Sequence, residues 1–486
     1  MKSVFLHLTR VWLGGGRWVV LLLVLGALAW TYAAHFWRVR PSIADFKAPH
    51  PLESRHLEMA ELARKDLKLD FSQGVSEPLN NWLPHATDGL VRPLWPWLSA
   101  WLMDDAEADG GQPGWSPRFA TRVQMIKLTF TLAVLLLLGL ACARAFSVPA
   151  ALLVVLLIGF GVFLPSGRFF LPDLLFSVLF LLTWVSCIAA LKRNSLWLYG
   201  AIGFFSALAN LTAPSATTLV IVFVGVSTLR WLWGWLLVQF SGVGISQWVR
   251  RNHWLGLVLL VVCHLFTVGP MLSFGHQKLG DAAPFHWRWF DSAEEMRAWT
   301  SAHHTRETLK AVPPDSLPSF EAYRAGHSTQ EMRERLGQGT LVVAGDVLSH
   351  EWGATFPRGI FVAALVVILA LLVLMLGFAT PRAHHAGQAL HPETAPIVFF
   401  TLLALVVCSF DFGWDAPVMD FGHRALALYP PLVLSLIWSC EALVQRGRRR
   451  QMRLPLLLVY EAVLWLLLGL GGWWMIAFLQ AAPITA

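Results

Sequence analysis

Long runs of apolar residues alternate with shorter polar segments along almost the whole of this chain. A helix needs about 20 apolar residues to cross the hydrocarbon core of a bilayer, and runs of roughly that length recur from residue 18 onwards. The pattern predicts about 11 spanning helices, at residues 18–36, 122–142, 148–165, 171–191, 196–212, 214–234, 254–274, 358–379, 395–411, 424–443 and 455–479. We therefore predict an all-α polytopic membrane protein, with one integral-membrane domain over residues 1–486.

Two long polar segments, residues 37–121 and 275–357, separate groups of these spans. The first predicts two short amphipathic helices: apolar residues recur at helical spacing from Leu57 to Leu67, and an apolar, aromatic run follows from Leu94 to Met103. The second segment predicts helices near 292–302 and 328–336 and caps the membrane part. Neither helix of the first segment is long enough to span a bilayer, so both should lie at its surface.

Positive charge orients the chain, because Lys and Arg accumulate on the cytoplasmic side of membrane proteins. Two separate helices on either side of Pro214 place nearly all basic residues of the short connections on one side. These are Lys2, Arg10, Arg17, Arg144, Lys192, Arg193, Arg230, Arg250, Arg251, Arg382, Arg446, Arg448, Arg449, Arg450 and Arg453. We therefore expect a cytoplasmic N-terminus, with the C-terminus and both long polar segments extracytoplasmic. A single kinked helix at Pro214 would reverse every later connection.

Composition excludes an ordinary soluble protein. Hydrophobic residues make up 56% of the chain and charged residues 14%, against roughly a quarter charged in soluble domains. The net charge of +7 reflects the connections between spans and not a nucleic-acid surface. The five Cys all fall in predicted spans without metal-ligand spacing and are interpreted as small apolar residues.

Two stretches of the first polar segment resemble a known family. Pro51-Leu52-Glu53-Ser54-Arg55-His56-Leu57-Glu58-Met59-Ala60 is similar to the acidic helix start of the first extracytoplasmic loop in the GT-C superfamily of integral-membrane glycosyltransferases, with Glu where Asp is usual. Arg92-Pro93-Leu94-Trp95-Pro96-Trp97 is similar to the Arg-Pro-rich run that follows it there. The resemblance implies an inverting, general-base-assisted transferase that takes a sugar from a polyprenyl-phosphate donor. Its partners would be membrane lipids and that donor, with no nucleic acid.

Such a reaction needs a base for the acceptor hydroxyl and cations for the leaving phosphate. Glu53 is the candidate base and Asp173, at the start of the fourth span, the candidate second acid of the same cavity. Glu58 is the alternative base. Structural interpretations compete with these roles, since an acid in the first turn of a helix is favoured by the helix dipole.

Cations on the extracytoplasmic side are candidates for phosphate binding. Arg168 and Arg424 run against the positive-inside bias, and a guanidinium can hold phosphate through two hydrogen bonds; contact with lipid headgroups is the competing explanation. The context from Gly422 to Pro431 resembles a late Arg-Tyr-Pro pattern of the superfamily, in which the basic residue contacts the donor phosphate. The remaining candidate substrate-binding residues are Arg55, His56, His286, Arg288 and His423.

Resident cofactors are not indicated. The sequence has no phosphate-binding Gly-x-x-x-x-Gly-Lys loop, no His-Glu-x-x-His and no Cys-x-x-Cys. The histidines of the second polar segment fit no tetrahedral spacing, which disfavours a metal site. The lipid-linked sugar donor is the one ligand that the resemblance implies.

Three functions compete on the sequence alone: the glycosyltransferase, a ligase or polymerase of lipid-linked glycans, and a transporter or non-catalytic membrane subunit of an envelope-polymer export system. The first requires an outward-facing cleft that opens to lipid, which we expect between the two long polar segments. Trp95 or Trp97 should lie near its opening. High Arg usage is consistent with a bacterial inner membrane.

Overall fold

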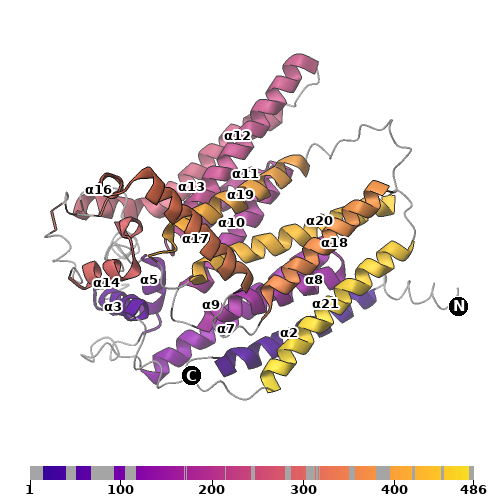
Figure 1. Cartoon of the computed structure of the whole chain (residues 1–486), viewed down its shortest axis with the longest axis horizontal. Coiled ribbons are helices and arrows are strands. Elements are labelled where there is room, and N and C mark those ends of the chain that lie inside the picture. The colour runs from indigo at the N-terminus through magenta and orange to yellow at the C-terminus, as the bar shows by residue number, and fades with distance from the viewer. Residues whose placement is uncertain are drawn as a thin grey trace, which may run out of the picture.

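A computed structural model describes the chain at residues 15–39, 51–66, 92–103, 116–168, 170, 172–213, 215–241, 247–279, 286–302, 312–313, 316, 318–349, 356–378, 394–418, 422–449 and 454–480. Every regular element in these ranges is a helix (Figure 1). Side chains are described for most of these residues. The all-α prediction therefore agrees with this part of the chain.

Within the described ranges, ten helices are long and apolar enough to cross a membrane. They belong to α2 (Arg17–Val39), α7 (Pro117–Ala145), the continuous run of α8 (Val148–Ile158), η4 (Gly159–Phe163) and α9 (Leu164–Arg168), α10 (Asp173–Arg193), α12 (Ala216–Ser241), α13 (Gln247–Leu279), α18 (Arg358–Phe378), α19 (Thr394–Asp415), η7 (Gly422–Leu428) with α20 (Tyr429–Arg449), and α21 (Leu454–Gln480). The chain is an integral membrane protein with about ten spans.

A shorter apolar helix, α11 (Leu196–Asn210), corresponds to the fifth predicted span. Its 15 residues cover less than the hydrocarbon thickness at 1.5 Å per residue. It nevertheless begins beside the end of α10, after a tight turn at Asn194 (φ 47°), and ends where the Leu211 carbonyl accepts a hydrogen bond from the Leu94 amide. The turn at residues 211–213 separates α11 from α12, so the chain has two helices here and not one kinked helix.

The centre of the bundle is formed by the run from α8 to α9 and by α10, which are buried along most of their length. Other spans keep one apolar face exposed; Leu23, Phe266 and Trp473 are more than two thirds exposed. Such faces are expected to lie against lipid.

One close contact between helices depends on glycine: a Cβ on Gly203 of α11 would collide with the Leu260 carbonyl oxygen of α13.

Helices of the two polar segments lie toward one end of the bundle (Figure 1). They are α3 (Pro51–Asp66), α5 (Leu94–Ala100), η5 (His286–Trp289), α14 (Ala293–Ala302), α16 (Phe320–Gly326) and α17 (Thr329–Ser349). In Figure 1, α3, α14 and α16 are at the left, and α17 runs from there toward the middle. The helices expected in both polar segments are therefore present in the described residues. The one expected at 328–336 is longer, because α17 continues to Ser349.

The opposite end of the bundle is tied by Glu441 near the end of α20. Its carboxylate accepts hydrogen bonds from the Ser147 hydroxyl (2.5 Å) and backbone amide (3.3 Å) at the start of α8, and from the Tyr460 hydroxyl of α21 (3.3 Å). Basic residues close the spans that end here, with Arg144 on α7 and Lys192 and Arg193 on α10.

Candidate functional site

Two of the expected residues meet where α10 and the η7–α20 span begin. Asp173 is the first residue of α10, directly after Pro172, and it is buried, with 4% of the residue exposed. The Arg424 Nε atom of η7 lies 3.6 Å from Asp173 Oδ1. The distance is longer than an ordinary hydrogen bond, so the two groups attract each other without a tight contact through these atoms.

A second ion cluster forms around Arg288 of η5. Its Nη2 donates to Asp411 Oδ1 (2.5 Å) and its Nε to Asp415 Oδ1 (2.7 Å), two carboxylates one turn apart at the end of α19. Thr218 of α12 donates to the other oxygen of Asp411 (2.8 Å). Burial lowers the pKa of Arg288, but the carboxylates of Asp415 and Asp411 outweigh it and raise that pKa overall.

Arg92 lies beside these clusters at the start of α5 and is 4% exposed. Burial, together with the positive charges of Arg424 and Arg288, lowers the pKa of Arg92 to about 9. Three guanidinium groups from three separate parts of the chain therefore act on the same region. Burial by itself disfavours a charge of either sign, whereas the neighbouring positive charges favour a bound anion.

Lys127 of α7 connects this polar region with the aromatic part of α5. Its Nζ lies 5.0 Å from the ring centroid of Trp95, a cation–π geometry, and its charge acts on the Asp173 carboxylate. Trp95 is held by a hydrogen bond from its Nε1 to the Phe170 carbonyl (3.3 Å).

Trp95 and Lys127 also line an apolar pocket of about 490 Å³. It is lined by α5, the two residues after it, α7 and the start of α10. The lining residues are Trp95, Trp97, Leu98, Trp101, Leu102, Val123, Ile126, Lys127, Phe130, Leu174 and Leu175. The tryptophans expected at a cleft are therefore part of a pocket. In the described residues the rest of this pocket is lined by the spans α7 and α10. The cleft expected between the two polar segments stays a prediction.

The first polar segment reaches this place through a small core of its own. Leu57 and Ala60 of α3 pack with Trp95 and Met103 around α5, against Phe119 of α7. This packing fixes the face of α3 that carries His56, which is buried.

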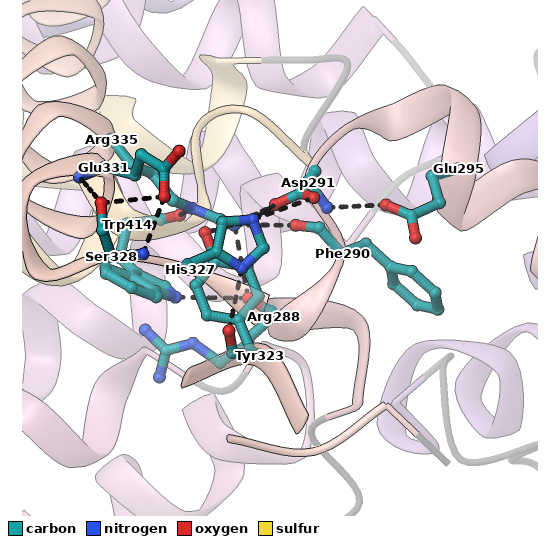
Figure 2. A network of polar contacts seen from close by, with 10 residues as sticks. All are labelled: Arg288, Phe290, Asp291, Glu295, Tyr323, His327, Ser328, Glu331, Arg335 and Trp414. Carbon is teal, nitrogen blue, oxygen red and sulfur yellow. Dashed lines mark hydrogen bonds and ion pairs between the residues drawn. The ribbon is translucent and has the colours of Figure 1, made fainter. Parts of the chain in front are cut away.

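In the second polar segment, Arg335 of α17 holds the backbone around Arg288 in place. Figure 2 shows how the Arg335 guanidinium gathers backbone carbonyls: it donates to Phe290 O (2.9 Å), Trp414 O (3.2 Å) and Arg288 O (3.3 Å). It also donates to the Tyr323 hydroxyl (2.9 Å) and stacks over the rings of Tyr323 and Trp414. Arg335 thus joins η5, α16 and α17 to the end of α19, where the acids of the Arg288 cluster lie.

The start of α17 is fixed by local contacts drawn in the same view (Figure 2). Ser328 and Glu331 form a reciprocal cap, in which the backbone amide and hydroxyl of Ser328 donate to the Glu331 carboxylate (2.7 and 2.9 Å). These two hydrogen bonds lower the pKa of Glu331. The His327 ring stacks on Tyr323 and reaches Asp291, with 3.0 Å between Nε2 and Oδ1.

The structure brings together Asp173, Arg288 and Arg424 of the residues expected from the sequence. His56 is buried and Glu58 half-buried on α3. The side chains of Glu53, Arg55, Arg168, His286 and His423 lie outside the described part of the structure, although their backbones belong to α3, α9, η5 and η7.

Sequence reasoning did not assign Arg92, Lys127, Arg335, Asp411 or Asp415 to the site. The ninth span was expected to end at residue 411, whereas α19 continues to Asp415. Two acids four residues apart at the end of a span were the available signal, because that spacing puts both on one face. In the described part of the chain, no group of three or more His, Cys, Asp and Glu side chains could hold a metal ion.

Comparison with known proteins assigns the chain to no family. No family model matches the sequence, and no curated protein is significantly similar to it.

Proposed function

We propose that this protein is a membrane glycosyltransferase of the GT-C type, which transfers a sugar from a polyprenyl-phosphate donor to a lipid, glycan or protein acceptor. One observation carries the proposal. Leu174 lines the apolar pocket, while its neighbour Asp173 faces Arg424 in the charged region. An apolar pocket next to a positively charged region fits a ligand with a hydrocarbon chain and a phosphate.

The charges support an anionic headgroup. Counting Arg92, Lys127, Arg288 and Arg424 against Asp173, Asp411 and Asp415, cations exceed carboxylates by one among these described residues. Asp411 and Asp415 are already engaged by Arg288. We assign Arg424 and Arg92 to the phosphate because Arg424 lies beside Asp173, the neighbour of a pocket-lining residue, and its charge acts on Arg92. There they would stabilise the charge of the leaving group.

A carboxylate is also available for proton transfer. In our proposal Glu53 or Asp173 accepts the proton of the acceptor hydroxyl as the sugar is transferred, and the phosphate leaves on its lipid. Asp173 lies beside Arg424, and α3, which carries Glu53, packs against the tryptophans of the pocket. Variants of both residues separate these two assignments.

The basic residues at the far end of the bundle support an extracytoplasmic site. Arg144, Lys192 and Arg193 lie at the ends of spans that begin near the site. The positive-inside rule places that far end in the cytoplasm. The proposed localisation is a bacterial inner membrane, with the site on its outer face.

The experiment is a binding measurement on the full chain in lipid nanodiscs. The probes are a polyprenyl phosphate, the matching polyprenol without phosphate, and inorganic phosphate alone. We expect the polyprenyl phosphate to bind most tightly, and Arg424→Ala to weaken that binding. Arg324→Ala, which removes an exposed arginine of α16, is the matched control. Equal binding of the phosphate and the alcohol would contradict the proposal.

The same preparation then tests transfer with lipid-linked sugars. Accumulation of free polyprenyl phosphate together with a glycosylated acceptor supports the transferase. Movement of the intact donor across the vesicle membrane without cleavage would instead support a transporter.

A further inference from the structure

The character of the exposed residues on α17 changes halfway along the helix. In the first half one glycine, Gly337, is exposed, and the exposed side chains are polar: Thr329, Gln330, Glu331, Arg333, Glu334 and Gln338. From Gly339 onward the exposed positions are apolar or small, and Leu341 is 74% and Val342 54% exposed. Leu348, two turns later, is also exposed.

The second half of α17 lies across the ends of two spans. A Cβ on Gly339 would collide with the Gly413 carbonyl oxygen near the end of α19, so the two helices are in direct backbone contact there. Nine residues later, the Leu348 carbonyl oxygen would be 2.9 Å from a Cβ on Gly359, in the first turn of α18. Between these two points Val343 and Val347 are buried. Figure 1 shows α17 running across the direction of α18 and α19.

This course puts Gly339–Ser349 beside the end of one candidate span, α19, and the start of another, α18. The neighbouring surface at that level is apolar as well: Ile360 of α18 is 67% exposed and Phe410 of α19 is 45% exposed. Those side chains belong to candidate spans, whose exposed apolar faces are suited to lipid. The exposed apolar face of α17 continues the same surface.

We propose that the second half of α17 is embedded in the acyl-chain region of one leaflet of the bilayer, while its first half stands in water. The partner is lipid, because exposed leucine and valine side chains at the end of a span have a lower free energy among acyl chains than in water. The proposal does not depend on the proposed reaction, since it rests on the exposure and course of α17 alone. The helix then anchors Arg335, one turn before Gly339, at a fixed height above the membrane.

Spin-label accessibility in vesicles tests this placement. Single cysteines are introduced at Leu341 and Leu348, and, as matched controls, at Arg333 and Gln338. The background is a Cys263→Ser chain, because Cys263 is the only described cysteine that is not fully buried. The full chain is reconstituted into phosphatidylcholine vesicles, and collisions with apolar oxygen and with a water-soluble nickel complex are measured by electron paramagnetic resonance.

We expect the preference to reverse along the helix. Labels at Leu341→Cys and Leu348→Cys should collide mainly with oxygen, and labels at Arg333→Cys and Gln338→Cys mainly with the nickel complex. High nickel accessibility at all four positions would overturn the proposal by placing the whole helix in water. Low accessibility to both reagents at Leu341→Cys, with dipolar broadening between labels, would overturn it in favour of a contact between two copies of the chain.

Discussion

Arg424 Nε lies 3.6 Å from Asp173 Oδ1, whereas Arg288 Nε lies 2.7 Å from Asp415 Oδ1. The two arginines therefore differ in how closely they contact their carboxylate partners within one polar region. Arg288 is held closely by two carboxylates, and its backbone carbonyl accepts hydrogen bonds from Arg335 and Trp414. Arg424 pairs with Asp173 beside the apolar pocket, where a bound phosphate would lie in our proposal, and the Arg288 cluster fixes the end of α19.

The first prediction concerns phosphate binding. Replacing Arg424 by Ala removes a charge-assisted hydrogen bond, so the free energy of binding of a polyprenyl phosphate should weaken by about 1.5–3 kcal/mol, which is about a 10- to 150-fold loss of affinity. Native mass spectrometry or microscale thermophoresis in nanodiscs measures the change. Arg324→Ala should bind like the parent chain. An unaltered affinity in Arg424→Ala would remove Arg424 from the site.

The second prediction separates the two candidate bases. If a carboxylate takes the acceptor proton, its amide variant should lower the transfer rate by about two to four orders of magnitude and leave donor binding largely intact. Glu53→Gln and Asp173→Asn are compared in the same transfer assay, with Glu58→Gln as a third variant. Full activity in all three would speak against base catalysis by these acids and for a non-catalytic membrane subunit.

The third prediction concerns stability. Arg288→Met leaves Asp415, which is fully buried, without its cation, and should destabilise the protein by about 3–5 kcal/mol. Thermal unfolding in detergent measures this as a lower midpoint. Arg333→Met, at an exposed position of the same polar segment, should unfold like the parent.

A double variant distinguishes the ion cluster from general damage. In Arg288→Met with Asp415→Leu, the buried charge disappears together with its partner, so part of the lost stability should return. A double variant less stable than Arg288→Met alone would show that the cluster is not the source of the effect.

The fourth prediction tests the apolar pocket by filling it. Leu102 lines the pocket, and Leu102→Trp should obstruct a long hydrocarbon chain. Binding of a long polyprenyl phosphate should weaken, while a short-chain prenyl phosphate should be affected less. The control is Leu137→Trp, on the exposed face of α7. Equal losses for long and short chains would indicate that the pocket does not hold the chain.

Periodicity and length were enough to place most of the fold. Apolar runs locate the spans, and Pro214 with the charge distribution correctly separates α11 from α12, because each signal depends on residues close together in the sequence. Helix α3 of the first polar segment could also be predicted from the sequence, since Leu57 and Ala60 lie on the apolar face that α3 buries.

Only part of the candidate site could be predicted from the sequence, because some of its contacts are made by backbone atoms. Asp173 and Arg424 stand out because a charge at the end of a span is conspicuous in sequence. Arg335 does not, since its partners are backbone carbonyls of residues 288, 290 and 414, which no side-chain pattern reveals. Asp415 was missed because hydropathy falls before the helix ends, and α19 continues one turn beyond its apolar run.

The most direct test of the central claim is an experimental structure of the full chain in nanodiscs with a bound polyprenyl phosphate. Our account predicts the phosphate between Arg92 and Arg424, close to Asp173, and the first isoprenoid units in the pocket lined by Trp95, Lys127 and Leu174. A phosphate bound at the opposite end of the spans, near Glu441, or a lipid chain that leaves this pocket empty, would contradict it.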